Sequence, residues 1–588
     1  MLSSKKSKEV WRTIHRILNP NEKRIKADPN TLNLHYITIA EQTTGSQKSN
    51  CEFDEITIES RNNEHNLLPR KTNYNEVLKQ IKLLRNDCST GPDEIPSKFI
   101  KASGDNIASP LTHIINSCIE KRVFPDAWKT ARVHPIPKVD TPLSPSDYRP
   151  ISILPTLSKI YKRIILTQLS EFIESKSIYA QTQSGFRKGH SCSSLLVKLK
   201  NDITKAMNRG EITIAIAADY SKAFDTVHYT KLLQLLKSLG LSNDFLKIIH
   251  SYLTNRNQYV QVDDTKSSTK SIYFGVPQGS ILGPVLFNLY VSDLSSILEN
   301  HSLQYADDTT FYAHGKVKDI NLITESLDAD IERMQQWSSD KNLALNSKKT
   351  YSILFGTPQM IAKHKLQEPN TFEIKCNGKT LLRKETIKLL GIHFNESLTW
   401  SIHVGELVTS GFSTLAILRK LKRFAPFHVR KSLAECMILS KIDYGSVVFC
   451  NLPQYLFIRL QKLQNAAASF VTGRYCRTQD VVKLNWLPVH ERIEFAVVKL
   501  VHRVLNDENS PNYLHLTKFK PVRTTRASLR SNYDLVIPIE KNIFENIAAK
   551  SFNSLTIELK RTEDYTKFCK LAKQHYLNKA KCRVLNEQ

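Results

Sequence analysis

The chain is 588 residues long and carries 83 Lys and Arg residues against 56 Asp and Glu residues, a net charge of +27 at pH 7. This length allows several structural units, and the basic balance suits a partner that offers phosphates, although ribosomal and membrane-surface proteins share it. The ten cysteines form no C-x-x-C pair and no run of about eighteen uncharged apolar residues occurs, which argues against zinc knuckles, disulfide frameworks, secretion and membrane spans and favours an intracellular protein.

The first part of the chain predicts a small extension. Residues Val10–Leu18 have the spacing of a short amphipathic helix that ends at Asn19-Pro20, and a polar stretch follows to about residue 70. We expect residues 1–80 to be an RNA-binding extension or a linker. Helical periodicity resumes at residues 74–84 and again at 111–121.

The first chemical feature is a carboxylate at the end of an apolar strand. Thr213–Ala218 is small, apolar and unbroken, which predicts a buried strand, and Asp219 follows it directly. A carboxylate at the end of a buried strand needs a cation or a hydrogen-bond donor beside it. The next residues predict a helix that continues through His228–Leu233, and we expect Asp225 to cap it or to pair locally.

A loop rich in glycine and proline comes next, at Phe274–Pro284, ahead of an apolar helix at Val285–Val291. Its glycines allow the backbone to approach a ligand closely, and Gln278 offers donors and an acceptor to a sugar, base or phosphate. Alone, this pattern is only a loop before a helix. Its position between the acidic segments at Asp219 and Asp307-Asp308 favours a ligand-binding role for this loop.

The third feature is the pair Asp307-Asp308, at the predicted tip of a β-hairpin between apolar runs. Adjacent carboxylates repel each other, and a bound divalent cation offsets that repulsion. Mg²⁺ fits best, because hard cations prefer carboxylate oxygens. A lone Asp-Asp dipeptide is more often a surface turn, but with Asp219 beside it three carboxylates would surround two cations, an arrangement suited to nucleotidyl transfer.

The chain beyond residue 400 is predicted to be mostly helical. Residues 401–480 hold 11 Lys and Arg residues against 4 Asp and Glu residues. This excess indicates a helical segment that binds a polyanion such as a nucleic-acid duplex, with the contacts concentrated at Arg419, Lys420, Lys422 and Arg423. Two charged amphipathic helices are expected between residues 539 and 584.

With these features on the page, the chain resembles the reverse transcriptases of non-LTR retrotransposons, especially jockey-like elements of the LINE type. The resemblance covers most of residues 80–515 and rests on blocks in the family's order. These blocks are Gly91–Pro96, Trp128–Lys138, Asp147–Ser152, Ser184–Ser191, Asp219–Asp225, Gly275–Pro284, Tyr305–Asp308, Leu345–Thr350, Leu389–Ile392, Leu398–Trp400 with His403, and Leu484–Pro488 with Arg492-Ile493.

The resemblance implies an α+β right-hand polymerase, with fingers, a palm built on a mixed or antiparallel sheet, a helical thumb, and helical extensions at both ends. The expected parts are an extension at 1–80, fingers and palm at 81–395 with the core from about 118, a thumb at 396–500, and a helical extension at 501–588.

The resemblance also implies the chemistry of single residues. Asp219, Asp307 and Asp308 would hold two Mg²⁺ ions, with Mn²⁺ as the alternative metal. Phe224 would lie under the sugar and reject a 2′-hydroxyl, although a plain core phenylalanine fits the position equally well. The residues expected to contact the incoming dNTP are Lys138, Arg149, Gln278 and Gly279.

Basic side chains complete the implied site. Lys349 is either a proton donor to the departing pyrophosphate or a phosphate contact. Arg187, Lys188 and His190 are expected to follow a nucleic-acid backbone. The minor departures from the family, Asn395 in place of Asp and Cys192 in place of Thr, lie outside the expected metal site.

The sequence leaves three functions to weigh. An RNA-directed DNA polymerase would take template RNA, a DNA primer and dNTPs, and would be found in nuclear and cytoplasmic ribonucleoprotein. Residues 1–80 are too short for the endonuclease that such elements carry, which suggests an endonuclease acting in trans. The alternatives are a catalytically inactive RNA- or DNA-binding protein, against which the three intact carboxylates argue, and an RNA maturase on the same scaffold, which the jockey-like C-terminal motifs disfavour.

Overall fold

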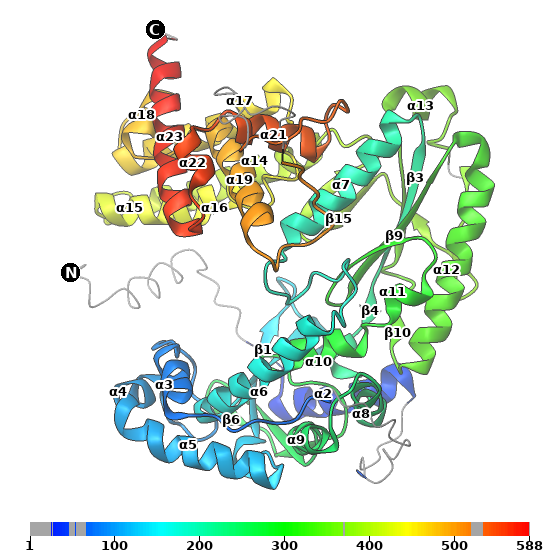
Figure 1. Ribbon diagram of the computed structural model, residues 1–588, viewed down its shortest axis with the longest axis vertical. Helices are drawn as coiled ribbons and strands as arrows, with labels where there is room; N and C mark the ends of the chain where they lie inside the picture. Colours follow the sequence, from blue (N-terminus) through cyan, green and yellow to red (C-terminus); the bar gives the residue numbers. More distant parts are fainter. Residues whose placement is uncertain are drawn as a thin grey trace, which may run out of the picture.

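The computed structural model describes residues 25, 27–45, 53, 66–368, 371–518 and 533–586. The predicted helix at Val10–Leu18 lies outside these residues, as does much of the predicted extension. In Figure 1 a helical body occupies the upper left, a second body of helices and a small sheet lies below, and a tall sheet joins the two on the right. These parts are the thumb side, the fingers and the palm of the right-hand fold expected from the sequence.

The fingers combine helices with a small sheet whose strand order is β2-β1-β5-β6, with β7 paired to β5. The strands are β1 (Ala131–Pro137), β2 (Tyr148–Ile153), β5 (Arg256–Val262), β6 (Thr265–Lys266) and β7 (Lys270–Ile272). The helices are α2 (Pro29–Thr44), α3 (Tyr74–Lys82), α4 (Ser97–Ala102), α5 (Gly104–Lys121), α6 (Thr156–Ser175), α8 (Tyr229–Ser238) and α9 (Asn243–Leu253). The helical periodicity at 74–84 and 111–121 is thus confirmed by α3 and α5.

The palm is a five-stranded sheet in the order β14-β11-β3-β9-β8. Its strands are β3 (Ile212–Ala218), β8 (His301–Tyr305), β9 (Asp308–Gly315), β11 (Tyr351–Phe355) and β14 (Leu382–Arg383). Around it lie α7 (Cys192–Asn208), α10 (Gly283–Tyr290), α11 (Leu294–Ile297), α12 (Ile320–Asp340), α13 (Pro358–Lys363), and the short pairs β4 (Tyr220–Ser221) with β10 (Ala344–Leu345), β12 (Lys375–Cys376) with β13 (Lys379–Thr380), and β15 (Thr386–Leu389) with β16 (Ile392–Asn395).

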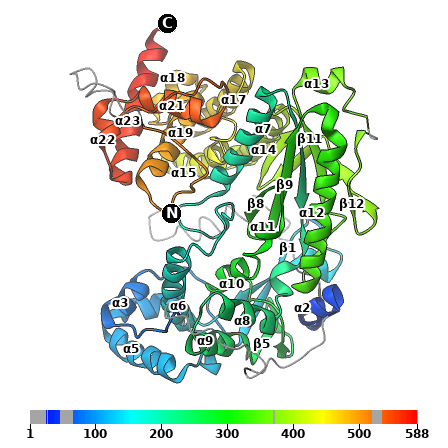
Figure 2. The ribbon, with the colours of Figure 1, turned by 45° about the vertical axis from the view of Figure 1, so that its right-hand side comes forward.

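Both faces of the palm sheet are covered, and this explains the unbroken apolar run of β3. Ile212, Ile214 and Ile216 point to the core shared with the fingers and α12, whereas Ala215 points to the core shared with α7 and the thumb side. Successive residues of a strand face opposite sides of the sheet, so a strand buried on both faces needs apolar residues throughout. Figure 2 shows α12 running along the sheet on one side and α7 near its top.

Within the described residues the regular elements of the thumb side are helices, beside one isolated antiparallel bridge between Lys518 and Leu535. Its elements are α14 (Ser401–Lys420), α15 (Phe427–Ala434), a π-helical turn (Glu435–Leu439), α16 (Ser440–Asp443), α17 (Gln454–Thr472), α18 (Thr478–Lys483), α19 (Val489–Asn506), α21 (Phe544–Asn553), α22 (Ile557–Arg561) and α23 (Tyr565–Asn586). The last region therefore contains three helices where two were predicted. Residues from α14 through α23 share one hydrophobic core with α7, so the proposed boundary at residue 500 stays a prediction.

Helix α7 belongs to the palm in sequence but packs against the C-terminal helices. Lys205 forms an ion pair with Glu545 at 2.8 Å, and the Asn201 side-chain amide donates to the same carboxylate at 2.7 Å. The C-terminal helices are therefore fixed to the palm by polar contacts as well as by apolar packing.

Helix α14 is long and apolar enough to span a membrane by length and composition alone. Such a single helix is weak support for a membrane span. Its buried residues, among them Val404, Leu407, Leu415 and Leu418, belong to the core of the helical body.

Two local details differ from the predictions, although α8 (Tyr229–Ser238) confirms the helix expected through His228–Leu233. The residues after Asp219 form a short strand, β4, and a 3₁₀ turn (Ala223–Asp225) before α8 begins at Tyr229, so Asp225 does not cap a helix. The hairpin turn consists of Ala306 and Asp307, because Tyr305 pairs with Asp308 and Ala306 has a φ of +58°. Asp308 is therefore the first residue of β9 rather than half of the turn.

Candidate active site

Strand pairing brings the three predicted carboxylates to one end of the palm sheet. Strands β3 and β9 are antiparallel neighbours in which Ala218 pairs with Thr309. Asp219 follows Ala218 and Asp308 precedes Thr309, so the pairing register alone places these two residues at adjacent strand ends. The two-residue turn then holds Asp307 next to them.

The carboxylates disfavour ionisation in one another. Burial raises the pKa of Asp219 and that of Asp307, and the charge of Asp307 raises the pKa of Asp219 further. Burial and the charges of Asp307 and Asp219 raise the pKa of Asp308 to about 6. Three acids that repel one another at the edge of a cavity suit a bound cation, which stabilises their ionised forms.

The donor set fits a hard divalent cation, since all three side chains offer carboxylate oxygens. Among the described residues, however, no group of three or more His, Cys, Asp or Glu side chains is arranged so that it could hold a metal ion. Lys349 lies 3.8 Å from Asp219 and offsets part of its charge. The three acids are therefore neighbours at the strand ends, but their side chains are not arranged as a set of metal ligands. The identity of the metal stays a prediction.

A cavity of about 620 Å³ opens beside these acids. It brings together most of the residues that the sequence assigned to catalysis and nucleotide binding, which are Lys138, Arg149, Asp219, Phe224, Gln278, Gly279, Asp307 and Lys349. Asp308 lines a second cavity of about 360 Å³, together with Asp219 and Lys349. We call the larger space the copying cavity.

Cations crowd one wall of the copying cavity. Burial, and after it the neighbouring Lys222, Arg149 and Lys349, lower the pKa of Lys138 to about 8. Positive side chains gathered in this way are stabilised by a polyanion such as a triphosphate. Sequence reasoning missed Lys222. Lys222 follows Asp219 by three residues, has a left-handed φ of +54° and lines the cavity.

The glycine-rich loop is held against both neighbouring segments. The backbone N–H of Ser152 donates to the Gln278 carbonyl at 2.8 Å, and a side chain at Gly279 would meet the Ser152 carbonyl at 2.9 Å, at a φ of +101°. The Gln278 amide donates to both oxygens of Asp225 at 2.8 and 2.9 Å. Asp225 thus pairs locally, as one of its two predicted alternatives required, and it orients Gln278.

Phe224 takes part in the core and also lines the copying cavity. Its ring stacks on Phe287 with centroids 4.2 Å apart and meets the edge of Phe186 at 6.5 Å. The ring is partly exposed toward the cavity that contains Asp219. Both interpretations of this residue therefore have a structural basis.

The structure places two of the three expected backbone contacts inside the fold. The Arg187 guanidinium binds Glu174 at 3.1 Å and the carbonyls of Ala180 and Gln183. His190 Nδ1 shares a hydrogen bond with Ser184 Oγ at 3.0 Å, and burial lowers its pKa to about 4, so its ring is neutral. Within this loop Lys188 is exposed, and its nucleic-acid contact stays a prediction.

The basic group at the end of α14 lies outside the copying cavity. Arg419, Lys420, Lys422 and Arg423 are all exposed, at the end of the helix and in the turn that follows. Lys349 is also exposed, in the turn after β10, where the N–H of Asn346 donates to the Asp219 carbonyl at 2.8 Å. The roles of these five residues stay predictions.

Acidic strand ends beside a cation-lined cavity define a class of phosphate-handling palm enzymes, and sequence comparison identifies the class. Residues 136–394 match the family described as reverse transcriptase (RNA-dependent DNA polymerase). The chain therefore carries a reverse transcriptase domain, as the resemblance predicted.

Similarity to known proteins identifies the group within this family. The chain is 30% identical over 439 residues to the RNA-directed DNA polymerase from mobile element jockey of Drosophila melanogaster, covering 71% of this chain and 46% of that protein. It is 28% identical to the probable RNA-directed DNA polymerase from transposon BS of the same species, covering 68% and 44%. Over 71% of its length the chain is thus similar to an RNA-directed DNA polymerase of a mobile element.

A further relative is the jockey polymerase of Drosophila funebris, 26% identical, with 79% of this chain and 49% of that protein covered. The chain thus spans about half the length of the curated relatives it matches. Among solved structures, apo telomerase from Candida tropicalis is similar with a TM-score of 0.37 and 11% identity, covering 67% of this chain and 68% of that one. That similarity is too low to argue from.

Proposed function

We propose that this chain is an RNA-directed DNA polymerase that adds deoxynucleotides to a primer 3′-hydroxyl on an RNA template. The observation that carries the proposal is the meeting of Asp219, Asp307 and Asp308 at one end of the palm sheet, beside a cavity lined by cations. Acids and cations that line one cavity suit a substrate that carries both a metal-binding phosphate and excess negative charge.

The chain's own residues divide the work. Lys138, Arg149 and Lys222 would hold the triphosphate, as permanent or nearly permanent cations with several donors. Gln278 and Gly279 would line the place of the incoming nucleotide, with Gln278 oriented by Asp225. Phe224 would pack against the sugar. Lys349 would donate a proton to the departing pyrophosphate or contact a phosphate.

Divalent cations fit this proposal through the acids at the strand ends. Asp219, Asp307 and Asp308 would hold two of them, Mg²⁺ or alternatively Mn²⁺. When bound, such ions neutralise charge on the attacking and leaving oxygens and lower the pKa of the primer hydroxyl.

The proposed partners are a template RNA, a DNA primer and dNTPs, with an endonuclease supplied in trans. The corresponding locations are nuclear and cytoplasmic ribonucleoprotein. The net charge of +27 supports a nucleic-acid partner, because phosphate contacts supply much of such binding.

The test is Mg²⁺-dependent deoxynucleotide incorporation by the purified chain on a primed RNA template. The variant Asp307→Asn/Asp308→Asn should lose incorporation and keep RNA binding. A matched control exists in the chain, because Asp263 and Asp264 form another Asp-Asp pair in a hairpin turn, between β5 and β6. The variant Asp263→Asn/Asp264→Asn should keep full activity. A folded wild-type chain that binds RNA and incorporates nothing would replace the proposal with an inactive binding scaffold.

A further inference from the structure

Two turns of the helical body lie side by side on its surface. One joins α14 to α15 and contains Lys422, and the other joins α17 to α18 and begins at Gly473. The Lys422 ammonium donates to the Gly473 carbonyl at 3.1 Å. Gly473 has a φ of +83°, and a Cβ added there would lie 3.8 Å from the Arg430 guanidinium. We call residues 421–427 and 473–483 together the two-turn surface.

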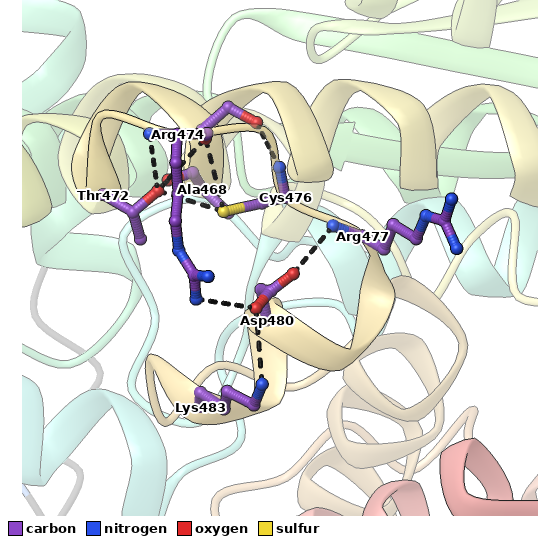
Figure 3. A network of polar contacts seen from close by, with 8 residues as sticks. Ala468, Thr472, Arg474, Cys476, Arg477, Asp480 and Lys483 are labelled. Atoms are coloured by element: carbon purple, nitrogen blue, oxygen red, sulfur yellow. Dashed lines mark hydrogen bonds and ion pairs between the residues drawn. The ribbon is translucent and has the colours of Figure 1, made fainter. Parts of the chain in front are cut away.

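The second turn is braced from within, as Figure 3 shows. The backbone N–H of Cys476 donates to Ser469 Oγ at 2.9 Å, which ties the turn to the end of α17. Asp480 accepts from the backbone N–H of Arg477 and from the Arg474 guanidinium, both at 3.1 Å. These contacts hold the backbone of the turn in one conformation, so less conformational entropy is lost when its side chains bind a partner.

What this braced surface exposes is unusual. Phe424 is 78% exposed, Tyr475 is 80% exposed and Phe427 is 50% exposed. Around them stand exposed cations, which are Lys422, Arg423, Arg474, Arg477 and Lys483. Within these two turns the one carboxylate is Asp480, whose side chain is 17% exposed and which is already paired with Arg474 and Lys483.

Exposed aromatic rings between cations match the chemistry of unpaired nucleotides. Flat rings stack on bases, and every base offers a face for stacking, while Arg and Lys side chains contact the phosphates between them. The bases of a duplex are already stacked on each other and do not present their faces. The two-turn surface therefore suits a single strand better than the duplex expected for the thumb.

We propose that the two-turn surface is a binding site for single-stranded RNA, separate from the copying cavity. Tyr475 and Phe424 stack on unpaired bases, and Arg474, Lys422 and Arg423 contact the phosphates between them. None of these five residues lines the copying cavity. The choice of RNA over DNA rests on the proposed function, in which this chain copies RNA.

The site gives the chain a means to hold template RNA that has not yet entered the copying cavity. Because its contacts are to base faces and phosphates, binding is tolerant of sequence. Such a site increases the residence time of the RNA on the protein without taking part in the chemistry.

The test measures binding of a short unstructured RNA to the full-length chain by fluorescence anisotropy at several salt concentrations. Tyr475→Ala should weaken binding about tenfold and leave the salt dependence unchanged, since stacking carries no charge. Arg474→Gln should weaken binding and reduce the slope of log K against log salt by about 0.7, the value for one phosphate contact on a single strand. Binding of a perfect RNA duplex should change in neither variant.

A matched control is Tyr455→Ala, because Tyr455 is 53% exposed at the other end of α17 and stands outside the two-turn surface. This variant should bind single-stranded RNA like the wild type. Tyr475 and Tyr455 are exposed, so their substitutions should leave the thermal unfolding temperature unchanged. Arg474→Gln should lower it only slightly, because an exposed ion pair such as that with Asp480 contributes little to stability.

Wild-type affinity in Tyr475→Ala and Arg474→Gln would overturn the inference. The inference would also be overturned if these two variants lost binding to vesicles with anionic lipid but kept their binding to RNA. That result would make the surface a membrane contact instead. Nucleotide incorporation by the wild type on a primed template is measured in parallel. If incorporation is present and the two variants bind RNA normally, only this inference fails and the proposed polymerase stands.

Discussion

Ser184 and Tyr513 are 329 positions apart in the sequence, and their hydroxyl groups lie 3.0 Å from each other. Ser184 is also bound to the palm, because its backbone N–H donates to the Gln304 carbonyl at 2.9 Å. Gln304 lies on β8, two residues before the turn that contains Asp307. A segment from beyond the thumb thus reaches, through one serine, the strand that carries the acidic turn.

The first prediction follows from this contact. Tyr513→Phe removes the hydroxyl and keeps the ring, so the free energy of unfolding should fall by ~1 kcal/mol, the typical net value of one hydrogen bond. Because Ser184, which is bonded to Gln304 on β8, then loses its hydrogen bond to Tyr513, the acidic turn is held less precisely. The kcat for nucleotide incorporation should therefore fall about threefold to tenfold with KM for dNTP unchanged. Steady-state kinetics and urea denaturation measure the two effects.

The control for that prediction is Tyr576→Phe. Tyr576 is fully buried on α23, and its hydroxyl has no hydrogen-bond partner among the described residues. Removal of this hydroxyl should leave kcat and stability unchanged or slightly improve stability. Equal kinetic effects in both variants would show that the Ser184 contact has no special role.

Phe224 provides a second prediction, which separates its two interpretations. If the ring packs against the sugar, Phe224→Ala should admit ribonucleotides and reduce the preference for dNTP over rNTP at least about tenfold. Loss of the stack on Phe287 should also cost ~3 kcal/mol of stability, as for other large-to-small changes in a core. Incorporation assays with paired dNTP and rNTP measure the ratio; destabilisation with an unchanged ratio identifies a plain core residue.

A third prediction concerns the contact between Gln278 and Asp225. Gln278→Glu replaces a donor with a second carboxylate, and burial already raises the pKa of Asp225. The variant should lose ~1–3 kcal/mol relative to the wild type at pH 7.5, because the acceptor is left without its donor beside a like charge. The loss should shrink at pH 5, where one carboxyl of the pair binds a proton and can donate again. Denaturation of both proteins at both pH values tests this.

The acidic hairpin makes stability depend on pH and on metal. The pKa of Asp308 is about 6 in the folded chain, above its ordinary value of 3.8, so the folded state binds a proton that the unfolded state releases between these values. Without metal, the contribution of Asp308 to stability is present below pH 3.8 and is lost as pH rises through about 6. Asp308→Asn should remove this component from the pH profile of the unfolding temperature.

Added Mg²⁺ should reverse that loss at neutral pH. A ligand that binds only the folded state stabilises it, by ~2.7 kcal/mol at a hundredfold excess over Kd. The unfolding temperature of the wild type should rise with Mg²⁺ at pH 7.5, while that of Asp307→Asn/Asp308→Asn should stay constant. A wild-type chain with no response to Mg²⁺ or Mn²⁺ would contradict the proposed metal site.

Local patterns predicted the parts of the site that lie on regular elements. The apolar run before Asp219 predicted β3 because a strand covered on both faces needs no alternation, and the loop at 274–284 was found before its helix. The turn at Ala306-Asp307 was misplaced by one residue, since the dipeptide rule cannot read the strand register that pairs Tyr305 with Asp308. Lys222 was missed because its place over the cavity depends on one left-handed residue.

The sequence by itself determined the chemistry of this protein: which acids and cations are present, the order of their motifs, and the class of polymerase they belong to. Only the tertiary structure decided which of these side chains meet. In the folded chain Arg187 forms an ion pair with Glu174, Gln278 donates a hydrogen bond to Asp225, and the hydroxyls of Tyr513 and Ser184 share a hydrogen bond. Composition and spacing act locally along the chain, whereas such contacts depend on how distant segments pack, and that is fixed only when the whole core is buried.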